Sequence, residues 1–380
     1  MYDVVVVGLG AMGSAAVAEI AARGRKVLGI EARHPAHKLG SSHGDSRIIR
    51  LGYHEDPAYV PLLRRAYGNW RRLERRLGAD ILTKTGVLQI GHPDGRLVGG
   101  MLKSCAEYGL AHEILERAAM EDRFPGFVLE SGEVAVLDPN GGYIRPETAI
   151  WGNLRLAMED GAELHIGEKV TAIEPGANSV TIRSPSASYR ARKVVVATGS
   201  WIAELVPRVA GRAVPIRQVV AWYRPSDDFA AQPQRMPCLL RDEGDRGSYF
   251  GFPQIGVDGV KIGKHTHFHE PIDPDRETPP VNDVDTAMLD SFAARRMPSV
   301  ATVRVRAVTC RYTMLPGEDF LIDSLPGEPS VVVCSACSGH GFKFTSVIGE
   351  ILADLSLDGG TDLPIARFSF NAHLELEETA

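Results

Sequence analysis

The sequence has too few cysteines and too little positive charge for several classes of protein. Five cysteines in 380 residues are too few for the disulfide framework of a small secreted protein, so we expect a reducing compartment, the cytoplasm. Lysine and arginine number 42 against 48 aspartates and glutamates, a net charge of −6. This balance argues against a nucleic-acid partner, because such partners attract a surplus of positive charge.

Long hydrophobic runs and linkers are also missing. No stretch approaches the roughly 18 apolar residues that a membrane span needs, and no basic segment with a cleavage site opens the chain. We therefore expect no membrane association and no N-terminal extension. Hydrophobic residues make up 44% of the chain, enough for a large core. At roughly 150 residues per domain, the length predicts two or three domains, or two interleaved ones.

A glycine-rich turn follows the first predicted strand. Residues 4–7 are four valines in a row, which is typical of a fully buried strand. Gly8, Gly10 and Gly13 come next, with G-x-G-x-x-G spacing, and residues 11–23 have the composition of a helix. The three glycines suit a tight turn, a close approach of the backbone to a pyrophosphate, and close packing of helix on strand, in that order.

The context of this motif makes it informative. A second predicted strand covers residues 26–30, and Glu31 follows it, so the segment is a complete β-α-β unit with an acid at its end. The helix N-terminus offers N–H groups and a positive dipole end to phosphates, and Glu31 can accept the ribose hydroxyls of an adenosine. The motif predicts a dinucleotide site, but by itself it does not separate NAD from FAD.

Three further segments contain residues whose side chains can bind ligands or take part in a reaction. Residues 40–50 form a small polar stretch that contains Arg47 and Arg50. Such a loop can approach a flat cofactor, and its arginines suit a carboxylate or an anionic ring. An ordinary surface loop is equally compatible with this composition. Residues 338–344 lie between a buried-type strand and the last predicted helix, which predicts a second anion site made by the backbone, with Lys343 aimed at it. A loop that only caps the helix is the alternative.

Residues 259–269 read as one strand. By period 2, Lys261, His265, His267 and His269 would share a face. Three histidines at alternate positions are compatible with a metal site, but no cysteine or acid cluster nearby completes one. We therefore expect no metal, and a partly exposed polar face for His267 and His269.

The cysteines by themselves do not predict a functional site. Cys310 stands near the end of a predicted strand, where a cysteine is usually buried and inert. Cys334 and Cys337 have C-x-x-C spacing, but neither a thioredoxin-like context nor a second such pair accompanies them. We expect no redox or metal pair there.

The order of the strands predicts the fold class. Buried, parallel-type strands occur early, in the middle and at the end of the chain, and alternating strands lie between them. This pattern favours an α/β protein in which two domains share the chain discontinuously.

Together these segments resemble the monomeric sarcosine oxidase family of flavin-dependent amine oxidases, which includes N-methyltryptophan oxidase and pipecolate oxidase. The resemblance covers nearly the whole chain in the same order. Its most specific part is Cys310, Tyr312 and Thr313 followed by the stretch from Ser338 to Phe344. It implies a two-domain fold like that of glycine oxidase, with a Rossmann-like, doubly wound FAD-binding domain and a catalytic domain whose antiparallel sheet roofs the flavin. The FAD-binding domain would comprise residues 1–82, 141–215 and 325–380, and the catalytic domain residues 83–140 and 216–324.

The resemblance also implies the cofactor and its contacts. FAD would be joined covalently to the sulfur of Cys310 through the flavin 8α carbon. The residues matched to cofactor binding are Gly8, Gly10, Gly13, Glu31, Ser42, His43, Cys310, Gly339, Gly341 and Lys343.

Roles in catalysis are implied in the same way. Lys261 matches the lysine that promotes reaction with oxygen, and Arg47 a cation beside the flavin ring. Arg50 and Lys343 match the pair that holds the substrate carboxylate. The residues matched to the substrate pocket are His265, Tyr312 and Phe250.

Two positions depart from the family pattern. Phe250 stands where the sarcosine-oxidising members have tyrosine, and Cys337 where an aromatic residue is usual. Both changes are in the pocket or at its rim, so the sequence does not determine which side chain the substrate carries. Arg50 and Lys343, the pair matched to carboxylate binding, are both present.

The expected function is oxidation of a secondary-amine amino acid, sarcosine or another N-methyl amino acid, by a monomer. A hydride would pass to flavin N5, the imine would hydrolyse, and O₂ would become H₂O₂. The alternatives are an oxidase of a cyclic amino acid such as pipecolate or proline, and a flavin dehydrogenase with another electron acceptor. A non-catalytic flavin protein would not need Arg50, Lys261, Cys310 and Lys343 together.

Overall fold

Two large sheets organise the protein, and the computed structural model describes residues 1–373. The first sheet has the order β10-β11-β12-β1-β2-β9, and β19 and β18 extend it from β12. Its parallel strands are β1 (Tyr2–Val7), β2 (Val27–Glu31), β9 (Glu163–Ile166), β12 (Ser188–Val196) and β19 (Glu328–Ser335). The antiparallel strands are β10 (Ala172–Pro175), β11 (Val180–Arg183) and β18 (Leu321–Leu325).

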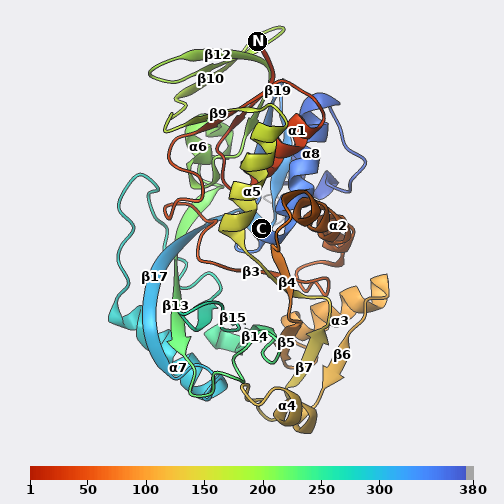
Figure 1. Cartoon of the computed structure of the whole chain (residues 1–380), viewed down its shortest axis with the longest axis vertical. Helices are drawn as coiled ribbons and strands as arrows, with labels where there is room; N and C mark the ends of the chain where they lie inside the picture. The colour runs from red at the N-terminus through yellow and green to blue at the C-terminus, as the bar shows by residue number, and fades with distance from the viewer. Residues whose placement is uncertain (374–380) are drawn as a thin grey trace.

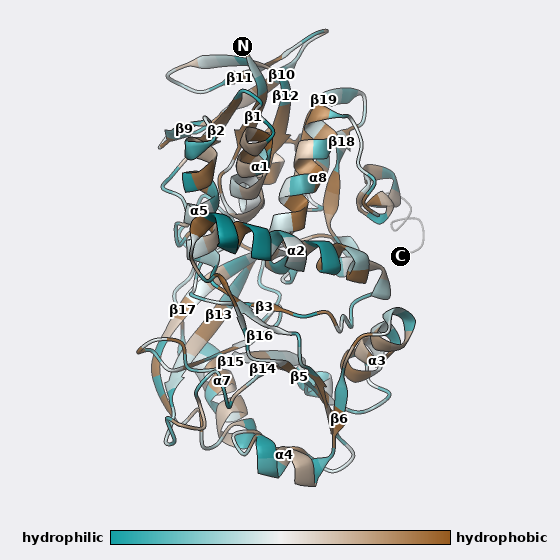
Figure 2. Cartoon of the chain, turned by 45° about the vertical axis from the view of Figure 1, so that its right-hand side comes forward, coloured by the Kyte–Doolittle hydropathy of each residue, from teal (hydrophilic) through white to brown (hydrophobic). Residues whose placement is uncertain are grey.

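Helices bury both faces of the first sheet. Val4 and Val6 of β1 face a core built with α1, α2, α5 and α8, while Val5 and Val7 face the opposite core, which includes residues of the short α6. These helices are α1 (Ala11–Ala22), α2 (Val60–Leu77), α5 (Pro146–Glu159), α6 (Ile202–Leu205) and α8 (Thr345–Leu357). Figure 2 shows the strands of this sheet mostly brown and the outer helix α2 largely teal. The run of valines is thus buried on both sides, as a parallel sheet requires.

The second sheet lies in the lower half of Figure 1 and has the order β17-β13-β16-β15-β14-β5-β7-β6. Its neighbours are antiparallel except for β14 and β5. The strands are β5 (Val87–Gly91), β6 (Glu113–Leu115), β7 (Val134–Asp138), β13 (Val214–Arg224), β14 (Cys238–Asp242), β15 (Ser248–Phe252), β16 (Val260–Lys264) and β17 (Val303–Met314). Around it lie α3 (Arg96–Tyr108), α4 (Arg117–Arg123) and α7 (Asp283–Arg296).

A small third sheet lies between these two parts. It pairs β3 (Arg47–Ile49), β8 (Gly142–Ile144) and β4 (Leu82–Lys84), so that strands distant in sequence meet. The mixed α/β fold class that the sequence predicts is confirmed. No helix among the described residues combines the length and the apolar character needed to cross a membrane.

The structure corrects the strand predicted for residues 259–269. β16 ends at Lys264, and a turn follows in which Thr266, His267 and His269 have positive φ angles of 54°, 48° and 53°. A strand cannot continue through left-handed residues, so the histidines do not share a face.

His267 was expected on a partly exposed face, and that prediction is wrong. The side chain is buried, and its Nε2 lies 2.7 Å from Oδ1 of Asp285 on α7. Asp285 also accepts hydrogen bonds from Arg217 at 3.0 and 2.6 Å. His267 therefore fastens the turn to α7 instead of facing solvent, whereas His269 is exposed.

Candidate active site

A cavity of about 490 Å³ opens between the first sheet and the second. It is lined from both sides, by the end of β1 and by residues of β13, β15, β16 and β17. Its volume lies in the range of small-molecule sites. The residues predicted from the sequence that line it are Gly8, Gly10, Glu31, Ser42, His43, Arg47, Arg50, Phe250, Lys261, His265, Cys310, Tyr312, Gly339, Gly341 and Lys343.

Gly13 is the one predicted residue that does not line the cavity, and its environment explains why a glycine stands there. A Cβ on Gly13 would lie 1.7 Å from the Gly8 carbonyl oxygen. Gly8 itself has φ +89°, and its own Cβ would lie 2.6 Å from the oxygen of Ala197 on the neighbouring chain segment. These two positions let α1 start directly against the end of β1.

The start of α1 offers an anion site. Gly10 precedes the helix without a side-chain cap, and Gly10, Ala11 and Met12 line the cavity. The N–H groups and positive dipole end of the helix therefore face the space where a pyrophosphate would lie. Beside them, Glu31 accepts hydrogen bonds from the main-chain N–H groups of Leu9 (2.8 Å) and Arg33 (3.0 Å), which fixes the turn. Burial raises the pKa of the Glu31 carboxyl.

Several buried polar atoms that line this cavity lack a partner in the protein. They are His37 Nδ1, His43 Nε2, Arg50 Nε, Thr198 Oγ1, Gln218 Oε1 and Ser335 Oγ. Buried polar groups are normally hydrogen-bonded, so the cavity is built for a ligand with many polar atoms. A large dinucleotide fits this requirement.

Two cations shape the loop that precedes β3. The Lys261 ammonium donates to the carbonyl oxygens of Gly44 (2.7 Å) and Ser46 (2.8 Å). The Arg47 guanidinium donates to those of Ser41 (2.7 Å), His43 (2.6 Å) and Ser46 (2.8 Å). Burial, and then Arg47, hold the pKa of Lys261 well below its usual value.

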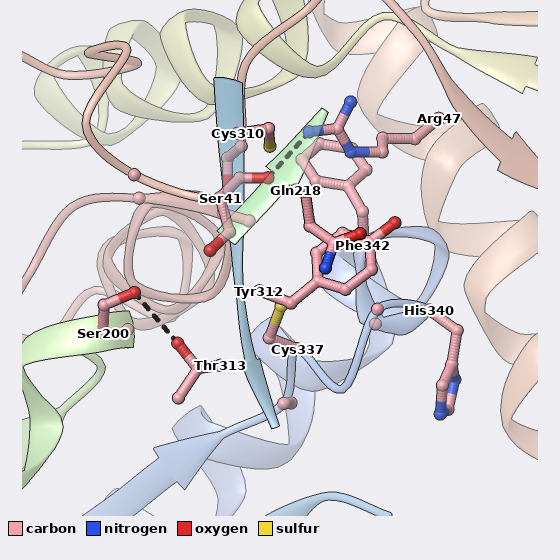
Figure 3. A pocket seen from close by; sticks show the side chains of 18 of the residues that line it. Ser41, Arg47, Ser200, Gln218, Cys310, Tyr312, Thr313, Cys337, His340 and Phe342 are labelled. Carbon is pink, nitrogen blue, oxygen red and sulfur yellow. Dashed lines mark hydrogen bonds between the residues drawn. The ribbon is translucent and has the colours of Figure 1, made fainter. Parts of the chain in front are cut away.

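The thiols of Cys310 and Cys337 belong to the same part of the cavity. Cys310 lies on β17 opposite Gln218 of β13, and its side chain is buried. Figure 3 shows Cys310, Tyr312 and Cys337 around one space, with Arg47 reaching across to Ser41. Burial raises the pKa of the Cys337 thiol.

A second pair of cations, Arg50 and Lys343, lines the cavity with both side chains buried. Arg50 is already paired, since its Nη2 lies 2.7 Å from each carboxylate oxygen of Glu55. The Lys343 ammonium donates to the main-chain oxygen of His340 at 2.5 Å. Burial, and then Arg50, lower the pKa of Lys343 to about 7. The two cations are therefore close enough to repel each other.

Three polar side chains, those of Arg96, His265 and Glu318, form another part of the cavity lining. His265 Nε2 lies 3.7 Å from Glu318 Oε1, and Arg96 lies 3.2 Å from Glu318 Oε2. The rings of His265 and Tyr312 are 5.8 Å apart. Phe250 of β15 also lines the cavity, and its ring fills the space that a side chain at Gly263 would need.

Sequence reasoning missed Glu55 and Glu318. Glu55 is only five residues from Arg50, so an acid close to a predicted anion-binding arginine was a signal that could have been weighed. Glu318 follows a turn after β17, and nothing local indicates that it meets His265.

The family assignment follows from comparison of this chain with known proteins. Residues 3–355 match the family described as FAD dependent oxidoreductase. The chain belongs to this family. The FAD-dependent oxidoreductase class expected from the sequence is confirmed, and the unpartnered polar atoms of the cavity fit the cofactor that the family uses.

Relatives within the FAD-dependent oxidoreductases cover nearly the whole chain. A monomeric sarcosine oxidase of Streptomyces avermitilis is 38% identical over 372 residues, 97% of this chain and 96% of that protein. An N-methyl-L-tryptophan oxidase of Yersinia pestis is 34% identical over 370 residues, 97% of this chain and 98% of its own length. The predicted resemblance to the monomeric sarcosine oxidase family is thereby confirmed.

Solved structures agree on the fold. The open form of NikD, an amino acid oxidase essential for nikkomycin biosynthesis, superposes with a TM-score of 0.84 at 26% identity and covers 97% of both chains. The glycine oxidase of Geobacillus kaustophilus gives a TM-score of 0.80 at 20% identity, covering 97% of this chain and 98% of its own. The latter likeness concerns the fold alone.

Proposed function

We propose that this protein oxidises the secondary amine of a small amino acid, sarcosine or another N-methyl amino acid, with FAD as cofactor and O₂ as electron acceptor. The observation that carries the proposal is the buried cation pair Arg50 and Lys343 in the cavity that also holds Cys310 and Lys261. Glu55 supplies one negative charge for these two buried cations, and the α-carboxylate of an amino acid would supply the second. The names of the two relatives point to the same substrate class.

Substrate binding would begin at Arg50. Its Nη2 now holds Glu55, so we expect a substrate carboxylate to take the place of that side chain while Lys343 supplies the second contact. His265, Tyr312 and Phe250 would then border the amine and the side chain. Closing this buried space around the substrate excludes water from the reacting atoms.

The cofactor would be held by the α1 N-terminus, Glu31 and the unpartnered polar atoms of the cavity, with the Cys310 sulfur as its covalent attachment. Bound FAD supplies the two-electron oxidation of the C–N bond to an imine and the transfer of those electrons to O₂ as H₂O₂. For an N-methyl amino acid, hydrolysis of the imine gives formaldehyde and the primary amino acid.

Lys261 is the residue we assign to oxygen reduction. Negative charge develops on oxygen during that step, and a fixed cation in a dry site stabilises it. Although burial opposes the charged form, the two carbonyl acceptors of Lys261 favour its ammonium. Arg47 adds positive charge to the same loop, and we assign it to the cofactor ring.

A second candidate is an oxidase of a cyclic amino acid. The apolar Phe250 ring in the cavity favours it, because the same cation pair would serve a bulkier substrate. The chain is expected to act as a monomer in either case, and the name of the first relative supports this.

The deciding experiment measures H₂O₂ release by the purified FAD-loaded protein. The panel contains sarcosine, N-methyl amino acids of increasing size, L-proline and L-pipecolate, each with and without an added artificial electron acceptor. Signal from N-methyl substrates supports the first candidate, and signal from cyclic substrates alone supports the second. Turnover that requires the added acceptor would contradict the use of oxygen.

A further inference from the structure

Tyr53 lies against both members of the cation pair. Its ring is fully buried, with the Arg50 Cζ 4.3 Å and the Lys343 Nζ 5.2 Å from the ring centroid. Both distances fall within the roughly 6 Å over which the face of an aromatic ring attracts a cation. Burial strengthens this attraction and also the repulsion between the two cations, which the Glu55 carboxylate on Arg50 offsets in part.

The hydroxyl of Tyr53 reaches Lys343 by a second route. His340 Nε2 lies 2.8 Å from the carbonyl oxygen of Glu318, which can only accept, so the ring hydrogen of His340 is on Nε2. Burial lowers the pKa of His340 to about 4, so its Nδ1 keeps a free lone pair at neutral pH. The Tyr53 hydroxyl donates to that Nδ1 at 2.5 Å.

His340 in turn holds Lys343, because its main-chain oxygen accepts the hydrogen bond from the ammonium. The backbone of Tyr53 is fixed as well, since the Ser104 hydroxyl on α3 donates to the Tyr53 carbonyl at 2.5 Å. One side chain therefore connects the segment after β3, which carries Arg50, with the loop before α8, which carries Lys343. These two segments are 287 residues apart where Tyr53 meets His340.

We infer that Tyr53 is the positioning residue of the carboxylate site: its ring holds Arg50 and Lys343 together against their repulsion, and its hydroxyl fixes the His340 loop that anchors Lys343. The inference rests on the proposed role of these two cations in binding the substrate carboxylate. Tyr53 itself does not line the cavity, so it would act through the two cations.

The test uses propionate, a carboxylate without an amine, titrated into the FAD-loaded protein and followed by the flavin absorption spectrum. Tyr53→Leu removes the ring, and we expect propionate binding to weaken by about tenfold or more. Tyr53→Phe keeps the ring and loses only the hydroxyl that fixes the His340 loop, so we expect a smaller loss of affinity, of a few-fold.

Tyr59→Leu is the matched control. Tyr59 belongs to the same buried aromatic cluster, 5.1 Å from Tyr53 by ring centroids, but the cation over its ring is Arg367, 4.8 Å away, and its hydroxyl bonds to Asp319. Equal weakening in Tyr59→Leu and Tyr53→Leu would overturn the inference, as would unchanged binding in Tyr53→Leu.

The pH dependence separates positioning from a general loss of structure. Propionate affinity should fall as Lys343 loses its proton, and removing the ring that stabilises the ammonium should shift this fall to lower pH in Tyr53→Leu. A merely structural defect would weaken binding at every pH without moving the midpoint. If Tyr53→Leu does not fold, a phenylalanine with a fluorinated ring can be placed at position 53. Fluorination weakens the attraction of the ring for cations at almost the same volume, so the pH midpoint of propionate binding should be lower than in Tyr53→Phe. An unchanged midpoint would overturn the inference.

Failure of the inference and failure of the proposed function give different results. If the wild-type protein does not bind propionate at all, the carboxylate site itself is refuted. If it binds propionate and the Tyr53 variants bind it equally well at the same pH midpoint, only the role of Tyr53 is refuted.

Discussion

One guanidinium nitrogen of Arg50 lies 2.7 Å from both carboxylate oxygens of Glu55. Burial alone would raise the pKa of Glu55, but Arg50, His54, His340 and Lys343 together outweigh burial and hold it well below its usual value. The protein thus fills its own candidate carboxylate site with one of its carboxylates. A buried arginine without such a partner would be strongly unfavourable, so Glu55 stabilises the protein before substrate arrives.

Glu55→Gln should separate stability from binding. The amide keeps the size of the side chain but removes the charge that competes with substrate, so we expect a KM several-fold lower and a free energy of unfolding lower by about 3 kcal/mol. Steady-state kinetics and urea unfolding measure the two effects. Glu318→Gln is the control, since Glu318 pairs with Arg96 and His265 instead of Arg50. A KM unchanged or raised in Glu55→Gln would contradict competition at Arg50.

The Lys343 pKa of about 7 predicts how substrate affinity depends on pH. A lowered pKa means that the ammonium loses its proton from about pH 7 upward in the free protein, whereas a bound carboxylate favours the ammonium. Binding therefore takes up a proton above pH 7, and KM should rise with pH there. Measuring KM from pH 6 to 9 in wild type and Lys343→Met tests this, because the variant should have a high KM without that inflection. An inflection that survives in Lys343→Met would belong to another group.

Cys310→Ser should release the cofactor from covalent attachment. The serine oxygen cannot replace the sulfur of the proposed bond, so acid precipitation should leave a colourless pellet and FAD in solution. Cys337→Ser is the matched control, since Cys337 lines the same cavity and should leave the pellet yellow. A yellow pellet from Cys310→Ser would place the attachment elsewhere.

Lys261→Met should slow reoxidation by O₂ far more than reduction by substrate. The loss of a cation beside developing negative charge raises the barrier of the oxygen step, and an effect of at least about a hundredfold is expected for a buried electrostatic contact. Stopped-flow measurement of the two half-reactions separates them. Lys264→Met is the control, because Lys264 lies on the same strand outside the cavity lining. Equal slowing of both half-reactions would refute the oxygen role of Lys261.

Gly13→Ala should destabilise the cofactor site directly. The new methyl would meet the Gly8 carbonyl at 1.7 Å, so α1 must shift, at a cost of about 1–3 kcal/mol and with loss of bound FAD. Gly68→Ala in α2 meets no atom within 4 Å and should instead stabilise by about 0.5–1 kcal/mol. Thermal unfolding and the FAD-to-protein absorbance ratio measure both. Normal FAD content in Gly13→Ala would show that the close packing of α1 on β1 is dispensable.

Local signals in the sequence determined the β-α-β unit at the N-terminus. The valines of β1 indicate burial on two faces, and the glycine spacing predicts the position where α1 begins, because both depend on residues within one turn or one strand. The same local reasoning failed after β16. Period 2 predicted a continuing strand, but Thr266 and His267 adopt positive φ angles. Neither residue is a glycine, so the sequence gives no signal of this conformation.

The sequence by itself determined the fold class, the family and a set of site residues, all of which except Gly13 line one cavity. Only the tertiary structure decided their partners. It paired Arg50 with Glu55, placed Tyr53 against Lys343 and His340, and buried His267 on Asp285. Glu55 lies five residues from Arg50, within reach of a local signal, but the other pairings depend on desolvation and on contacts between segments as much as 287 residues apart, so no local pattern encodes them.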